Sequence, residues 1–226
     1  MTKRVTFPAI PESFGVASGA LAMPGGEAKA PAVVVLQEFW GLNEHIESIA
    51  DRWAAAGFLA LAPDLYRGQV TTDSNRASKL MDSLDRARAL SDIAGAAAFL
   101  RSQPRCNGKV GVTGYCLGGA FAFAAAATLE GIDAAVPFYG IPPGVDWSKV
   151  SAPIQAHFSR TDGWARAEVA EQVQSVLQAQ GCTMELFIYD APHAFCNDTR
   201  PDVYSPDAAS AAWQRAVAFM QQHLGS

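Results

Sequence analysis

Apolar runs alternate with amphipathic segments along most of the chain, and this alternation predicts the fold class. The first long apolar run, PAVVVLQEF (31–39), is β-branched and uninterrupted, as expected for a strand buried on both faces. It is followed by HIESIADRWAAAG (45–57), in which Ile46 and Ile49 share one helical face and Gly57 is a predicted C-cap. The pattern predicts a strand followed by a helix, the repeating unit of an α/β sheet.

The same alternation continues to the end of the chain. Further strands are predicted at 58–65, 109–116, 133–140, 152–162 and 183–191. Further helices are predicted at 77–103, as one long helix or two with a break, and at 118–129, 166–181 and 205–224. Strands that alternate with helices imply a mostly parallel, doubly wound sheet with helices on both faces. We interpret GALAMPGGEAKA (19–30) as a hairpin turn between two early edge strands, and expect residues 1–226 to form one domain.

Composition narrows the class of protein further. Half of the 226 residues are hydrophobic, which is enough for a substantial core. Lys and Arg total 17 against 22 Asp and Glu, a formal charge of −5 that argues against a nucleic-acid-binding protein. The N-terminus lacks the apolar region of a signal peptide, and the longest apolar stretch is too short to span a bilayer. We therefore predict a cytoplasmic protein without nucleic-acid or membrane partners, as a monomer or small homo-oligomer.

The four cysteines show no C-x-x-C pair, and we expect reduced thiols. The spacing Asp190-x-x-His193-x-x-Cys196 is not a usual zinc pattern, and no second cluster supports it. The sequence therefore predicts no metal and no cofactor.

Four reactive side chains fall where the predicted strands end: Glu38, Cys116, Asp162 and His193. Ligands bind at this edge of an open α/β sheet. Cys116 lies in a Gly-x-Cys-x-Gly step between a strand and a helix, where a nucleophile is held on a strained turn between small neighbours. The helix N-terminus that follows favours a thiolate.

The chain order of these residues is that of a catalytic triad on this kind of sheet, nucleophile first, then acid, then histidine. Cys116, Asp162 and His193 follow that order. Asp162 lies in a turn after a strand, and His193 alone among the histidines follows the final strand. The remaining histidines have structural explanations: His45, His157 and His223.

Several motifs together resemble the dienelactone hydrolase (carboxymethylenebutenolidase) family, which has the α/β-hydrolase fold. The motifs are LQEFWGLN (36–43), APDLYRG (62–68), GYCLGG (114–119), RTDGW (160–164) and HAFCNDTRPDVYSPDAASAAWQR (193–215). The resemblance covers nearly the whole chain. It implies that Cys116 is the nucleophile, His193 the base and Asp162 the group that orients it. It also implies an oxyanion hole made by the backbone N–H groups of Leu117 and Phe39.

The resemblance further implies a controlling role for Glu38. In such enzymes this glutamate holds the resting thiol protonated or paired until substrate binds. The physical chemistry agrees, since a carboxylate beside a thiol raises the thiol pKa by like-charge repulsion. The reaction implied is hydrolysis of an activated (enol) ester or lactone through an acyl-thioester on Cys116.

Substrate recognition departs from the family pattern. The family holds a substrate carboxylate with two arginines, one of them four residues after the histidine, where this chain has Asn197. Arg76 is near the expected place of the other arginine but does not align securely. We expect Asn197 and Arg76, with Trp164 and Tyr139 as pocket walls, to contact a small ester or lactone.

Two other classes of function stay open from the sequence. A cysteine amidotransferase, or a redox or stress protein, can carry a similar elbow. The amidotransferases have a glutamate two positions after the histidine, however, and here that residue is Phe195. A binding module on a degenerate hydrolase scaffold is the second alternative. The presence of all three triad residue types argues against it.

Overall fold

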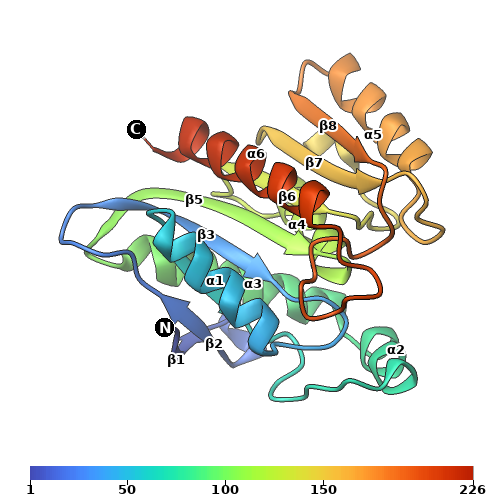
Figure 1. Ribbon diagram of the computed structural model, residues 1–226. Coiled ribbons are helices and arrows are strands. Elements are labelled where there is room, and N and C mark those ends of the chain that lie inside the picture. The colour runs from blue at the N-terminus through green and yellow to red at the C-terminus, as the bar shows by residue number, and fades with distance from the viewer. Residues whose placement is uncertain (226) are drawn as a thin grey trace.

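The computed structural model describes residues 1–225 and contains one eight-stranded sheet (Figure 1). The strand order is β1-β2-β4-β3-β5-β6-β7-β8. Strands β4, β3 and β5 to β8 are parallel, and β1 and β2 add an antiparallel edge. The strands are β1 (Lys3–Pro8), β2 (Val16–Ala22), β3 (Ala30–Leu36), β4 (Leu59–Pro63), β5 (Cys106–Tyr115), β6 (Ala134–Phe138), β7 (Ile154–Ser159) and β8 (Met184–Tyr189).

Helices cover both faces of the sheet. They are α1 (Glu44–Ala55), α2 (Ser74–Asp82), α3 (Arg86–Ser102), α4 (Leu117–Thr128), α5 (Ala167–Ala179) and α6 (Pro206–Leu224). Helices α1 and α6 pack on one face, in front in Figure 1, while α3, α4 and α5 contribute to the core on the other. Along β3, Val33 and Val35 enter one core and Val34 and Leu36 the other. Burial on both faces explains why this strand is an unbroken apolar run.

The predicted mostly parallel α/β fold with helices on both faces is confirmed. The long segment predicted at 77–103 forms two helices, α2 and α3. The break occurs at Asp85, the N-cap of α3, whose carboxylate accepts hydrogen bonds from the N–H groups of Ala87 and Arg88. This side chain starts a new helix at a point where the apolar periodicity alone shows no boundary.

The interpretation of residues 19–30 as a hairpin between edge strands is wrong. Strand β2 pairs with β1 and β4, and β3 lies on the far side of β4. The segment after β2 therefore crosses past β4 to reach β3. Helix α1 connects β3 to β4 and returns the chain to the edge of β3. Strand β4 therefore occupies the place next to β3 that a hairpin would have given to β2. The early hairpin is instead β1 with β2.

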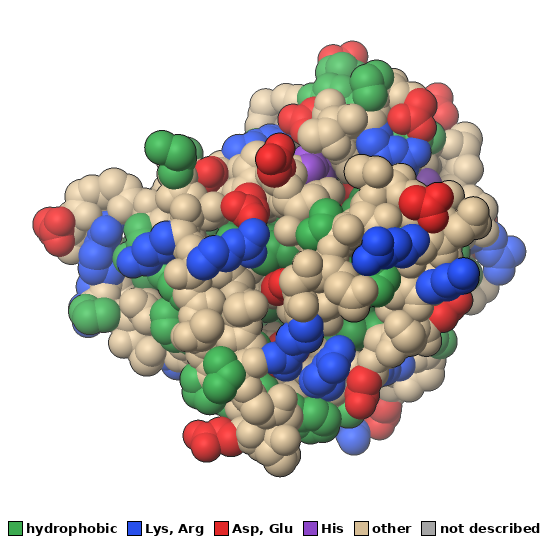
Figure 2. Space-filling view, turned by 90° about the horizontal axis from the view of Figure 1, so that it is seen from below, with side chains coloured by type: hydrophobic (Ala, Val, Ile, Leu, Met, Phe, Trp, Pro, Cys, Tyr) green, Lys and Arg blue, Asp and Glu red, His purple; other side chains and the backbone are tan. Residues whose placement is uncertain are grey.

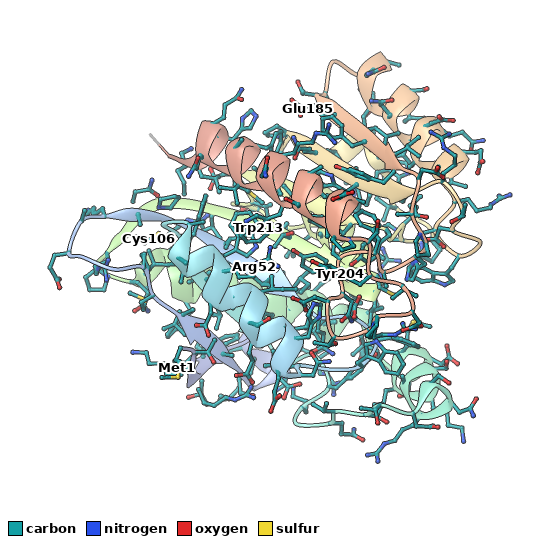
Figure 3. All side chains as sticks on the ribbon, in the orientation of Figure 1. Met1, Arg52, Cys106, Glu185, Tyr204 and Trp213 are labelled. Atoms are coloured by element: carbon teal, nitrogen blue, oxygen red, sulfur yellow. The ribbon has the colours of Figure 1, made fainter. Side chains whose placement is uncertain are left out.

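A chain of hydrogen bonds ties the end of β8 to its neighbours. Arg215 donates to the Tyr189 hydroxyl (2.9 Å), which lies 2.9 Å from Nδ1 of the buried His157. The other ring nitrogen of His157 is 3.1 Å from Oε1 of Gln155, whose amide donates to Glu185 (labelled in Figure 3). These partners assign the proton of His157 to Nε2, and burial lowers the pKa of this histidine to about 3. The structural explanation predicted for His157 is consistent with this position.

Within residues 1–225, no helix is long and apolar enough to span a membrane.

Candidate active site

Cys116 lies on a sharp turn between β5 and α4. Its backbone has φ 56° and ψ −115°, in the left-handed region that residues other than glycine rarely adopt. Two glycines make the turn possible. A Cβ on Gly118 would collide with the carbonyl groups of Leu36 and Gln37, and one on Gly114 with the carbonyl of Gly118. The Gly-x-Cys-x-Gly step therefore has a steric cause, and it places the thiol at the start of a helix.

Two backbone N–H groups converge on the Cys116 sulfur. They belong to Leu117, the first residue of α4, and Phe39, in the loop after β3, and both favour the thiolate by hydrogen bonding. Strands β3 and β5 are neighbours in the sheet, which brings the two donors together. An oxygen bound to the carbon under attack would need two such donors, and these two are the pair that the family resemblance implies.

Asp162 and His193 form a short hydrogen bond, with 2.5 Å between Oδ2 and Nδ1. The other carboxylate oxygen accepts from the N–H groups of Trp164 (2.8 Å) and Ala165 (3.0 Å). Burial would raise the pKa of Asp162, but the hydrogen bond and charge of His193 and these two N–H groups hold it below its usual value. An ionised Asp162 fixes the orientation of the His193 ring.

Aromatic rings hold His193 from two sides. Tyr139, fully buried, lies with its ring centroid 5.1 Å from that of His193, and the half-exposed Trp164 lies edge-on at 5.5 Å. No hydrogen bond within residues 1–225 joins His193 to Cys116, whose sulfur lies against the backbone donors.

Glu38 is buried beside the thiol, two residues beyond the end of β3. Its Oε2 accepts a hydrogen bond of 2.6 Å from the Asn197 amide, and its Oε1 is buried without a partner among the described residues. Burial raises the pKa of Glu38 to about 7, opposed by the Asn197 hydrogen bond and by the charges of His193 and Arg200. This carboxyl can therefore gain or lose a proton near neutral pH.

The Cys116 thiol is 7% exposed, and its pKa is raised well above the ordinary range. Burial is the main cause and the neighbouring Glu38 the second, while the N–H groups of Leu117 and Phe39 act in the opposite direction. The resting sulfur is therefore a neutral thiol at physiological pH.

Asn197 is 1% exposed and is held in one orientation. Its Oδ1 accepts from the backbone N–H of Thr199 (3.1 Å) and from the Thr199 hydroxyl (2.7 Å). The amide nitrogen is thereby directed to Glu38. The structure brings Asn197 to the candidate active site, where its amide contacts Glu38 and its side chain lines a polar cavity of about 230 Å³.

Two residues near the site were missed by the sequence reasoning. Thr199 sets the orientation of Asn197, and the Asn-Asp-Thr sequence is a recognisable signal for such a turn. Tyr66 is buried close enough to Cys116 for a thiolate there to raise the pKa of its phenol, after the larger effect of burial. The only signal for Tyr66 was its place in the APDLYRG motif.

No hydrogen bond or ion pair within residues 1–225 joins the Arg76 side chain to these residues, and its role stays a prediction. It is exposed on α2, where its backbone N–H binds the N-cap Asp73. Arg200 lies nearer, lining the polar cavity, and its guanidinium donates to Asp202 at 2.7 Å.

A second cavity, of about 260 Å³, lies beside the elbow and is lined in part by residues of α4. Its walls are almost entirely apolar. They are formed by Met81, Leu84, Arg86, Leu117, Ala120, Phe121, Ala124, Ile141, Pro142, Pro143 and Trp164. Of the predicted pocket walls, Trp164 lines this cavity, while Tyr139 packs beneath His193.

The chain is similar to known proteins in both sequence and structure. The model of the dienelactone hydrolase family matches residues 17–224. Protein usf of Aquifex pyrophilus is 34% identical over 205 residues, covering 86% of this chain and 89% of its own length. The carboxymethylenebutenolidase of Pseudomonas putida is 31% identical over 214 residues, covering 89% and 90%.

A similar solved structure is that of a Klebsiella pneumoniae protein assigned to the dienelactone hydrolases. It has a TM-score of 0.85 at 28% identity and covers 97% of this chain and 99% of its own. Sequence, fold and family match agree over nearly the whole length. The chain therefore belongs to the dienelactone hydrolase family and is a hydrolase of carboxylic esters or lactones.

Proposed function

We propose that the enzyme hydrolyses activated (enol) esters or lactones through an acyl-thioester on Cys116. The observation that carries this proposal is the pair of backbone donors converging on the Cys116 sulfur at a strained elbow. Such donors stabilise the oxyanion that forms when a nucleophile adds to a carbonyl carbon. The hydrogen bond between Asp162 and His193 supports the role of His193 as the base, at the same edge of the sheet as Cys116.

The proton of the thiol must leave before attack. Glu38 is the proposed proton acceptor, because it lies near enough to affect the pKa of Cys116, its buried Oε1 has no partner among the described residues, and its own pKa is about 7. The thiolate adds to the acyl carbon, the C–O bond of the leaving group breaks, and Glu38 passes the proton it took from the thiol to the departing enol or alcohol. His193 then takes a proton from a water molecule, whose oxygen bonds to the acyl carbon as the C–S bond breaks, and this proton returns to the Cys116 sulfur.

A cysteine nucleophile suits a substrate with a good leaving group. In the tetrahedral intermediate an alkoxide leaves less readily than a thiolate, so an ordinary alkyl ester returns to substrate. An enolate or phenolate leaves more readily and commits the reaction. We expect turnover of p-nitrophenyl acetate and very little of ethyl acetate, and equal rates on the two would count against a thiolate nucleophile.

The direct test is trapping of the acyl-enzyme. After brief mixing with p-nitrophenyl acetate and acid quenching, mass spectrometry should find one acetyl group on the peptide that contains Cys116. Cys116→Ser should keep the fold and lose most turnover. Cys182→Ser removes a half-buried thiol that bonds the Val150 carbonyl and should leave the rate unchanged. Full activity of Cys116→Ser would overturn the mechanism.

A further inference from the structure

The apolar cavity beside the elbow lies between the two halves of the proposed catalytic machinery. One wall is Leu117, whose N–H is a proposed oxyanion donor. Another is Trp164, whose ring is edge-on to His193 and whose backbone N–H donates a hydrogen bond to the Asp162 carboxylate. A group attached to the reacting carbonyl can therefore reach this cavity directly.

The cavity offers little to a charged group. Arg86 is the one charged residue among those that line it, and its exposed guanidinium donates to the Pro143 carbonyl at 2.8 Å. On the opposite side of the site, the Asn197 amide is occupied by Glu38 and Arg200 is paired with Asp202. A carboxylate placed among the apolar walls would lose its hydration without gaining a bidentate partner.

We infer that the substrate places an uncharged hydrocarbon group, about the size of a phenyl ring, in this cavity. The inference rests on the proposed function, because it assumes that the reacting carbonyl sits at Cys116. A cavity of about 150 Å³ lined by apolar side chains is enough to bind benzene. The cavity of about 260 Å³ therefore holds a ring with its linking atoms.

Esters matched in reactivity test this inference. Vinyl acetate has two small arms, vinyl phenylacetate has an apolar acyl arm, and phenyl acetate has an apolar leaving arm. Monovinyl succinate and 4-acetoxybenzoate carry a carboxylate on the corresponding arms. We expect kcat/KM for at least one of the two apolar esters to exceed that of vinyl acetate by tenfold or more. The charged esters should not exceed vinyl acetate.

Variants locate the effect in the cavity. Ala124→Leu adds bulk to a lining position and should remove the gain in kcat/KM of the apolar ester over vinyl acetate. Because Ala124 is buried, a variant at a less buried lining position provides a second line of evidence. Leu84 and Leu80 are both half-buried against the same core, but only Leu84 lines the cavity. Leu84→Gln should reduce the gain several-fold, and Leu80→Gln should not.

Three results would overturn the inference. The first is a charged ester preferred over its apolar counterpart, in particular if Arg86→Gln abolishes that preference. The second is equal rates on all the esters, and the third is a gain that survives both Ala124→Leu and Leu84→Gln. Failure of the proposed function would look different, because Cys116→Ala would then still turn over vinyl acetate.

Discussion

At the scale of single residues, the candidate site contains a carboxyl group, that of Glu38, whose pKa is about 7. Glu38 is buried, with one oxygen bound by Asn197 and the other unpartnered. Its place near Cys116 could be predicted, since both follow neighbouring parallel strands. The role of Asn197 toward Glu38 could not, because the contact joins residues 159 positions apart and depends on the fold of the final loop.

The buried carboxyl predicts how stability depends on pH. The pKa of Glu38 is about 7 in the folded protein and 4.5 in the unfolded chain, so between these values the folded state binds more protons. Stability therefore falls as pH rises from about 4.5 to 7. At about 1.4 kcal/mol per unit, the loss is about 3 kcal/mol. Urea unfolding from pH 5 to pH 8 should show this loss in the native protein and not in Glu38→Gln. Parallel curves would contradict it.

The hydrogen bond from Asn197 predicts a second pH effect. Asn197→Leu removes the neutral donor that opposes the high pKa of Glu38, so that pKa should rise by about one unit. The midpoint of the pH profile for Cys116 alkylation by iodoacetamide should move upward by the same amount. Thr199→Val removes one of the two donors that orient Asn197 and should give a smaller shift in the same direction. An unchanged midpoint in both variants would exclude this role.

At the scale of elements, the turn from β5 to α4 packs so closely against its neighbours that Gly114 and Gly118 have no room for a Cβ. The motif, the strand before it and the helix after it were all predictable from local sequence, because each depends on neighbours in the chain. The pairing of β2 with β4 was not predictable in that way. It depends on the path of the crossover between β3 and β4, and the predicted hairpin was accordingly wrong.

Gly118→Ala tests the close approach at the elbow. The added Cβ would meet the carbonyl groups of Leu36 and Gln37, and moving this backbone displaces the loop that carries Phe39. We expect a loss of about 1–3 kcal/mol in unfolding free energy and a loss of activity of 100-fold or more. Gly163→Ala is the matched control, because its Cβ has open space although it adjoins Asp162. Equal effects of the two substitutions would refute the steric explanation.

At the scale of the whole molecule, all the strands of the described chain form one continuous sheet. The first strand forms one edge and the last strand the other, with helices on both faces. Charges of both signs are interspersed over the face seen in Figure 2, in keeping with a net charge of only −5.

The continuous sheet predicts a single cooperative unfolding transition. Both halves of the proposed catalytic machinery, the elbow after β5 and the histidine loop after β8, follow strands of the same sheet, so neither should unfold alone. Far-ultraviolet circular dichroism and tryptophan fluorescence should give coincident curves in urea. Two separated transitions would show that residues 1–226 do not behave as the single domain predicted from the sequence.

The burial of the nucleophile also bears on its resistance to oxidation. Peroxides react with exposed thiolates, whereas Cys116 is 7% exposed and neutral at rest. A thiol that stays neutral until substrate binds, as the family resemblance implies for Cys116, reacts slowly with peroxides between turnovers. Burial and the neighbouring Glu38 carboxyl, which keep this thiol neutral, therefore also protect the sulfur from oxidation.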